Sequence, residues 1–303
     1  MGLYKYVRLR GSREVTIYFG PAGASESFYA QGHKSSLDMP EWLAKLGLNA
    51  YEYQSTRGVK IGEGMAVKLG LLASQKGIRL SMHAPYYINL SARDEEMKRK
   101  TRGHLLRSFK TASLMGAKVV VFHPGSGSGG DRKDILAGAK SFLKEILNEA
   151  EAEGIGDVQL APETMGKRNQ LGSLEEILEL CELGSRLVPA VDFGHLHALS
   201  GGALVDKPAF AAILKLIQER LGQAYIQNLH IHFSPVEFTG GGEKKHGTTL
   251  EANLGPGFTP LAEALVEWDL TPTVICESAG RQAEDAMVYR DIYRRLREKK
   301  KKA

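Results

Sequence analysis

The chain has 303 residues, of which 43% are hydrophobic and 25% are charged, and its formal net charge is +5. These values are typical of a soluble globular protein with a substantial core. Two distant cysteines, Cys181 and Cys276, exclude a disulfide framework. No apolar run approaches the ~18 residues of a membrane span, and residues 1–15 lack the apolar stretch of a secretory signal. We therefore expect a cytoplasmic protein with no membrane association, and nothing in the sequence implies a protein partner.

Eight short apolar runs follow one another along the chain, and helix-like segments separate them. The runs cover residues 15–20, 49–54, 78–85, 117–124, 157–164, 187–195, 228–234 and 272–280. Helices are expected at 39–47, 95–116, 134–154, 173–184, 208–222 and 258–269, and many of them start at Ser or Pro and stop at Gly. This alternation predicts an α/β fold in which residues 1–303 form a single (β/α)8 TIM barrel domain. A doubly wound open sheet is the alternative. The basic tail at about 297–303 is expected to be a solvated helix end.

A His, Asp or Glu stands at the end of each of the last six predicted strands. In chain order these residues are His83, His123, Glu163, Asp192 with His195, His232 and Glu277, and His246 follows in the long loop after the seventh strand. In a TIM barrel the carboxyl ends of all strands point at one mouth, so we expect these side chains to converge. Imidazoles and carboxylates suit Zn²⁺, Mn²⁺ or Fe²⁺. The pattern therefore predicts a metal site with a catalytic role at the mouth.

Four further histidines have other expected roles. His33 and His104 lie in a loop and in a helix, and we predict that both are surface residues. His197 is expected to support the loop after the sixth strand. His230 shares strand parity with His232, so both could face inward. We assign His230 a polar role in the core or behind the metal ligands, with direct metal ligation as the alternative.

Six motifs now carry a family resemblance: HAPYYIN at 83–89, VFHPGS at 121–126, PETMGK at 162–167, VDFGHLHA at 191–198, HFS at 232–234 and CES at 276–278. In this order they resemble the successive motifs of the endonuclease IV family, zinc-dependent endonucleases that act at abasic sites in DNA. That family has the (β/α)8 fold of the xylose-isomerase-like barrels. By resemblance the ligands fall into three groups: His83, His123 and bridging Glu163 for one ion; Glu163, Asp192, His232 and Glu277 for a second; and His195 with His246 for a third.

The chain departs from the family pattern after the seventh strand. Lys244 stands where the family places an Asp ligand, and an ammonium group repels a cation. Glu243 could take its place through a shift of the loop. We therefore expect two Zn²⁺ ions and a third position that is weak or empty. Arg57 and Tyr86 are candidate contacts to DNA or to a sugar phosphate, and solvated loop residues are the alternative interpretation of both.

The resemblance implies a metal-dependent hydrolase that binds DNA containing abasic sites and cuts the backbone 5′ to the lesion, as in base excision repair. Glu163 would be the catalytic bridge between two ions that activate a hydroxide. A sugar isomerase or epimerase on the same barrel is the main alternative, with one or two divalent metals and with Glu163 and Glu277 as acid and base. A nucleic-acid binder without activity is the third alternative.

Overall fold

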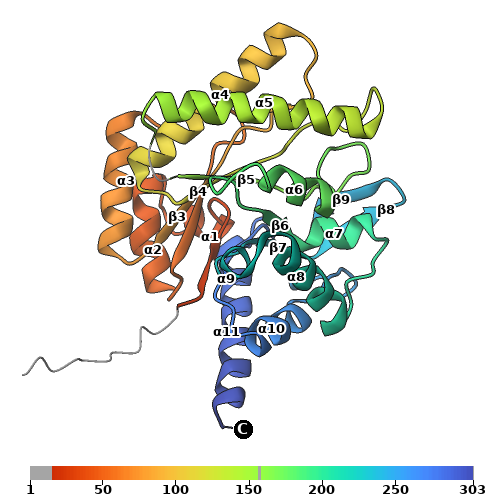
Figure 1. Cartoon of the computed structure of the whole chain (residues 1–303). Coiled ribbons are helices and arrows are strands. Elements are labelled where there is room, and N and C mark those ends of the chain that lie inside the picture. Colours follow the sequence, from red (N-terminus) through yellow and green to blue (C-terminus); the bar gives the residue numbers. More distant parts are fainter. Residues whose placement is uncertain (1–15, 156–157, 303) are drawn as a thin grey trace, which may run out of the picture.

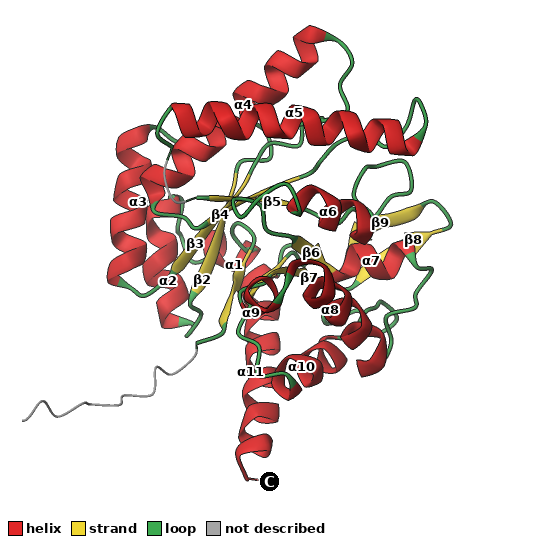
Figure 2. Ribbon diagram, viewed as in Figure 1, coloured by secondary structure: helices red, strands yellow, loops and turns green. Residues whose placement is uncertain are grey.

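Eight parallel strands form the centre of the molecule in a computed structural model that describes residues 16–155 and 158–302. The barrel strands are β1 (Tyr18–Pro21), β2 (Ala50–Gln54), β3 (Arg79–His83), β4 (Val119–Phe122), β5 (Gln159–Pro162), β6 (Ala190–Asp192), β7 (His230–Phe233) and β10 (Thr273–Cys276). Each corresponds to a predicted apolar run. Figure 2 shows the strands at the centre with helices around them. The segment 1–15, for which no secretory signal is predicted, lies outside the described residues.

The strands close into a barrel through two hydrogen-bonded halves. One half has the order β1-β10-β7-β6 and the other has the order β2-β3-β4-β5. A parallel bridge between Ala22 and Glu52 joins the halves at β1 and β2, and a bridge between Glu163 and Ala190 joins them at β5 and β6. The predicted TIM barrel is therefore confirmed, and the open doubly wound sheet is excluded.

Helices cover the barrel, and those predicted from the sequence are present. The helical elements are α1 (Glu26–Ala30), η1 (Ser36–Asp38), α2 (Met39–Lys45), α3 (Glu63–Gln75), α4 (Glu95–Met115), α5 (Arg132–Ala152), α6 (Leu174–Cys181), α7 (Phe193–Leu199), α8 (Lys207–Leu221), α9 (Gln223–Gln227), α10 (Phe258–Glu267) and α11 (Gln282–Lys302). Ser173 begins α6 with a capping box that includes Glu176. The basic tail continues α11 to Lys302, and Lys300 pairs with Asp269. No helix among the described residues is both long enough and apolar enough to span a membrane.

Strand parity decides which side chains enter the barrel. On β4, Val120 and Phe122 pack into the main core with the helices, whereas Val119 and Val121 belong to a small separate cluster with Ala161 and Ala190. Because side chains alternate along a strand, the residue that follows this second set, His123, also faces inward. The same alternation applies to the other barrel strands, so the predicted ligands in or directly after them share the parity of the barrel interior; these are His83, His123, Glu163, Asp192, His232 and Glu277.

A two-stranded antiparallel hairpin stands where the sequence predicts only a long loop after the seventh strand. It consists of β8 (Val236–Thr239) and β9 (Gly242–His246), and it lies beside α7 at the edge of the molecule (Figure 1). The hairpin is tied to the loop after β5, because the backbone N–H of Glu243 donates to the carbonyl of Gly166 at 2.8 Å. The hairpin therefore carries His246 to the mouth of the barrel.

Candidate metal centre

Glu163 lies at the centre of the converging side chains and is fully buried. Its Oε2 atom is 3.2 Å from Nε2 of His83 and 3.2 Å from Nε2 of His123. Its Oε1 atom is 3.1 Å from Nδ1 of His232. The two oxygens of one carboxylate thus face imidazoles on opposite sides, which is the arrangement that a bridging metal ligand needs.

The eight predicted ligands form three overlapping groups, in each of which the ligand atoms lie within 4.8 Å of one another. The groups are His83, His123 and Glu163; Glu163, Asp192, His232 and Glu277; and Asp192, His195 and His246. Oδ2 of Asp192 is buried and has no hydrogen-bond partner, although buried polar atoms normally have one. A bound cation would balance the negative charge of this buried oxygen. The mixed nitrogen and oxygen donors fit Zn²⁺, Mn²⁺ or Fe²⁺.

Backbone carbonyls and a hydroxyl fix the orientation of three imidazoles. Nδ1 of His83 lies 2.8 Å from the carbonyl oxygen of Ala84, and Nδ1 of His195 lies 2.8 Å from that of Thr164. Nδ1 of His246 lies 2.6 Å from Oγ of Ser234. For His83 and His195 the carbonyl is an acceptor only, so Nδ1 keeps a proton and Nε2 is the nitrogen that would bind a cation once its own proton is lost.

His195 is not at the end of a strand, which corrects the prediction. β6 ends at Asp192, and residues 193–199 form α7, because Asp192 caps this helix by accepting from the backbone N–H of His195 at 2.8 Å. Gly194 allows the backbone of Ser234 and the side chain of Asp192 to approach this helix closely. A Cβ there would lie 2.7 Å from the carbonyl oxygen of Ser234 and 3.1 Å from Oδ1 of Asp192. The Asp-x-Gly-His motif is therefore a helix start that holds a carboxylate and an imidazole together.

Buried charges at the centre perturb one another strongly. Burial opposes ionisation of Glu163, but the charge of His232 and the hydrogen bond from His123 hold its pKa well below its ordinary value. Burial acts to lower the pKa of His195, yet Asp192 and Glu163 raise it to about 9. A metal ion therefore has to displace a proton from His195 at neutral pH.

Lys244 does not enter the site. Its side chain is 59% exposed, and its Nζ donates to Oε1 of Glu237 at 2.6 Å on the hairpin. The carboxylate close to His195 and His246 comes instead from Asp192, which the resemblance assigned to the second ion. Glu243 is mostly buried at the mouth, with Oε2 3.9 Å from Nζ of Lys167.

The mouth opens into a cavity of about 460 Å³, here called the mouth cavity. Tyr86 lines it and stacks on His123, with ring centroids 4.9 Å apart, so its ring lies at the mouth beside a predicted ligand. Arg57 is exposed in the loop after β2 and is not among the residues that line the cavity. Lys167 and Gln54 also line this cavity.

The other four histidines lie outside the three ligand groups. His33 stacks on Phe28 and is partly buried, and His104 packs near Tyr87, so neither is a fully exposed surface residue. His197 is buried and packs edge-to-face on Phe238 of the hairpin. His230 forms a further group with Glu52 and His232.

Glu52 is a site residue that the sequence does not predict. It lies in the middle of β2, is fully buried, and is 2.9 Å from Nε2 of His230 and 3.0 Å from Nε2 of His232. The predicted ligands were recognised by their position at strand ends, and Glu52 precedes the end of its strand by two residues. Its parity, shared with Ala50 in the barrel interior, is the signal that could have found it.

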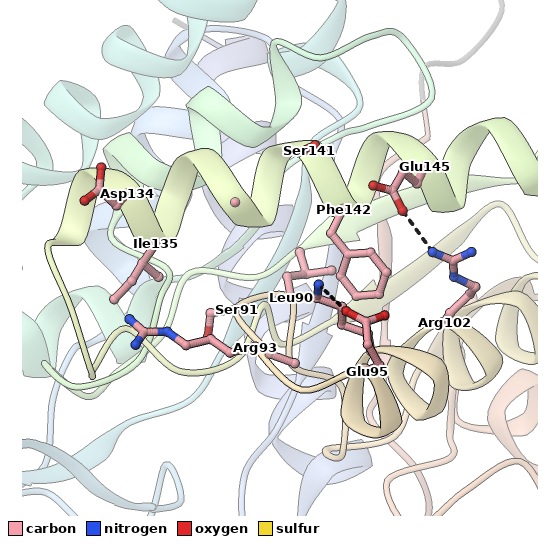
Figure 3. A pocket seen from close by; sticks show the side chains of 13 residues that line it. Leu90, Ser91, Arg93, Glu95, Arg102, Asp134, Ile135, Ser141, Phe142 and Glu145 are labelled. Atoms are coloured by element: carbon pink, nitrogen blue, oxygen red, sulfur yellow. Dashed lines mark hydrogen bonds and ion pairs between the residues drawn. The ribbon is translucent and has the colours of Figure 1, made fainter.

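A larger cavity of about 690 Å³ lies away from the metal centre, between α4 and α5 (Figure 3). Leu90, Ile135 and Phe142 supply its apolar lining. Four of its charged residues form two ion pairs, Arg102 with Glu145 and Lys98 with Glu95, while Arg93 donates to the carbonyl of Gly129. This cavity therefore adds no side chain to the candidate metal centre.

Gly166 of the PETMGK motif packs closely against the hairpin and against His195. A Cβ at this position would lie 2.6 Å from Cβ of Glu243 and 2.8 Å from Cδ2 of His195. Gly166→Ala should therefore push the hairpin and His195 apart, destabilise the fold by about 1–3 kcal/mol and weaken metal binding at the His195 and His246 group. Thermal unfolding and a Zn²⁺ titration measure both effects.

Gly138→Ala is the matched control, since Gly138 lies in α5 and a Cβ there would meet nothing within 4 Å. This variant should be as stable as the wild type or up to about 1 kcal/mol more stable. If Gly166→Ala were as stable as Gly138→Ala and bound Zn²⁺ equally well, the hairpin would not pack closely on Gly166.

The fold and the site define a class: a (β/α)8 barrel with a candidate metal centre at the carboxyl ends of its strands. The chain belongs to the xylose isomerase-like TIM barrel family, whose model matches residues 40–299. It is 36% identical over 288 residues to an uncharacterized protein of Methanocaldococcus jannaschii, covering 94% of this chain and 100% of that protein.

The comparisons also include endonucleases and an epimerase-like protein. A probable endonuclease 4 of Acholeplasma laidlawii is 29% identical over 195 residues, which cover 62% of each chain. The crystal structure of endonuclease IV from Thermus thermophilus has a TM-score of 0.68 at 20% identity and covers 88% of this chain and 95% of its own. A D-tagatose 3-epimerase-like protein has a TM-score of 0.65 at 22% identity, with 86% and 93% covered. These matches confirm the resemblance to endonuclease IV, and the two solved structures confirm the barrel.

Proposed function

We propose that this chain is a metal-dependent phosphodiesterase that cleaves the DNA backbone 5′ to abasic sites. The observation that carries the proposal is the position of Glu163, whose two oxygens face His83 and His123 on one side and His232 on the other. A carboxylate with ligands on both sides suits a centre of two ions, and such centres are common in enzymes that cleave phosphate esters. The sequence match to a probable endonuclease 4 supports the same function.

The residues that would hold the ions are those of the three ligand groups. We propose Zn²⁺ in at least two of them, with Mn²⁺ or Fe²⁺ as alternatives, because imidazole nitrogen and carboxylate oxygen suit these ions. Asp192 would supply the carboxylate for a third ion at His195 and His246. When bound, such ions lower the pKa of a water molecule towards neutrality and so provide hydroxide at neutral pH.

Residues around the mouth cavity would bind and orient the nucleotide. A volume of about 460 Å³ admits a sugar phosphate that lacks a base. The side chain of Lys167 is 49% exposed there, so its ammonium group can pair with a phosphate. Tyr86 offers an aromatic face beside His123 for the deoxyribose. An abasic nucleotide has lost its stacking partner, so rotating it into the cavity costs less than flipping an intact one.

A sugar epimerase or isomerase is the second candidate function. The mouth cavity has a size that also suits a monosaccharide, and the fold is similar to that of a D-tagatose 3-epimerase-like protein. Glu163 and Glu277 would then act as acid and base on the two sides of a keto sugar. This function needs only one or two ions.

One pair of assays separates the two functions. The protein, loaded with Zn²⁺ or Mn²⁺, is incubated with an end-labelled duplex that carries a single tetrahydrofuran abasic site, and separately with D-tagatose and D-fructose. We expect a single cut 5′ to the lesion that leaves a 3′-hydroxyl, at a rate roughly 100-fold above that on the undamaged duplex, since flipping an intact nucleotide costs a few kcal/mol more. EDTA should abolish the cut. Conversion of either sugar without any cleavage of DNA would refute the nuclease and favour the epimerase.

A further inference from the structure

A buried polar network lies behind the metal centre, on the inner faces of three strands. Its centre is Glu52 of β2, which is fully buried. Oε2 of Glu52 lies 2.9 Å from Nε2 of His230 on β7 and accepts a hydrogen bond from Oγ of Ser81 on β3 at 2.9 Å. Oε1 accepts from Nε2 of Gln54 at 3.2 Å. A buried carboxylate with this many donors can stay ionised without a metal ion of its own.

The network touches the metal centre at one residue, His232. Nε2 of His232 lies 3.0 Å from Oε1 of Glu52, while Nδ1 of the same ring lies 3.1 Å from Glu163 and 3.3 Å from Glu277. His232 is therefore oriented in the opposite sense to His83 and His195, whose Nδ1 atoms face backbone carbonyls. Its Nδ1 is the nitrogen that faces the proposed metal position.

We propose that Glu52 is a positioning residue that keeps the proton of His232 on Nε2 and thereby presents the Nδ1 lone pair to the metal ion. Nε2 of His232 is buried and makes no aligned hydrogen bond, so its 3.0 Å approach to Oε1 of Glu52 is a charge contact. A lone pair on Nε2 this close to a carboxylate oxygen would be repelled, whereas an N–H group at the same place is attracted. A carboxylate behind a ligating imidazole fixes the tautomer and the ring orientation, and it makes the imidazole a stronger ligand.

The inference rests on the proposed metal centre, but it holds whether the substrate is DNA or a sugar. It also assigns a role to His230 and Ser81. Both donate to Oε2 of Glu52 and leave Oε1 turned towards His232. They would hold the carboxylate in place without touching the metal ion.

Zn²⁺ affinity is the first test. Glu52→Gln keeps the shape of the side chain and removes its charge, so Zn²⁺ held by His232 should bind about 10–100-fold more weakly, as measured by competition with a chromophoric chelator. Glu267→Gln is the matched control, because it makes the same change of carboxylate to amide on α10, where Glu267 pairs with Lys207 outside this network. We expect it to bind Zn²⁺ within about threefold of the wild type. Equal affinity of Glu52→Gln and the wild type would overturn the role of Glu52.

Nitrogen-15 spectra of the Zn²⁺-loaded wild type, labelled at histidine, test the geometry without any variant at Glu52. The His232 signals, assigned by their loss in His232→Asn, should show a metal-bound Nδ1 and a protonated Nε2. Coordination through Nε2 would overturn the inference even if Glu52→Gln failed to fold. A wild type that binds no Zn²⁺ would refute the metal centre as well, whereas Zn²⁺ binding without DNA cleavage would refute the proposed function alone.

Discussion

Replacing Glu163 with glutamine is expected to lower turnover by about three orders of magnitude while the barrel stays folded. Glu163 is fully buried, and its two oxygens face His83 and His123 on one side and His232 on the other. Glutamine keeps the volume, but it removes a negative charge and turns one oxygen into an NH₂ group that cannot bind a cation. One side of the centre therefore loses its shared ligand, and at least one ion should bind more weakly.

Steady-state turnover of the preferred substrate and metal content by mass spectrometry measure this effect. Glu267→Gln is a suitable control, because Glu267 lies at the end of α10 and pairs only with the exposed Lys207 among the residues that the structure describes. The control should keep wild-type activity and metal content. Wild-type turnover and metal content in Glu163→Gln would show that Glu163 does not bridge two ions.

Removing the metal should abolish activity and lower the melting temperature on the order of 10 °C. Glu163, Asp192 and Glu277 lie close together at the mouth, and Glu163 and Glu277 act to raise the pKa of Asp192, as burial does. Bound cations compensate these like charges in the folded state only. At a free metal concentration about 1,000-fold above Kd, the stabilisation by binding is about 4 kcal/mol.

Thermal unfolding before and after dialysis against EDTA measures the decrease in melting temperature. We expect Zn²⁺ or Mn²⁺ to restore both the melting temperature and the activity, whereas Ca²⁺ should not, because the site is rich in imidazole. The protein as purified should contain at least two transition-metal ions per chain. A protein that takes up none after incubation with Zn²⁺ or Mn²⁺ would contradict every function proposed for this site.

The ligands at strand ends could be predicted because their positions depend only on local features of the sequence. Residues such as His123 and Glu277 directly follow an apolar run, and parallel strands of a barrel end at one mouth. The prediction places His195 in the sixth strand because the apolar residues of β6 continue without a break into the short helix α7. The cap formed by Asp192 marks the boundary between the two elements. Glu52 was missed because a charged residue inside a strand gives no local sign of the partner that will compensate it.

The amino-acid sequence is sufficient to predict the alternation of strands and helices, the ring of His, Asp and Glu residues at the strand ends, and the resemblance to endonuclease IV. Those features depend on the order and spacing of residues along the chain. Three features appear only in the folded chain: the sheet closes between β5 and β6, Lys244 turns outward to Glu237, and Glu52 lies beside His232. These contacts join residues distant in sequence or depend on a bulge in the hairpin, so strand register and burial determine them.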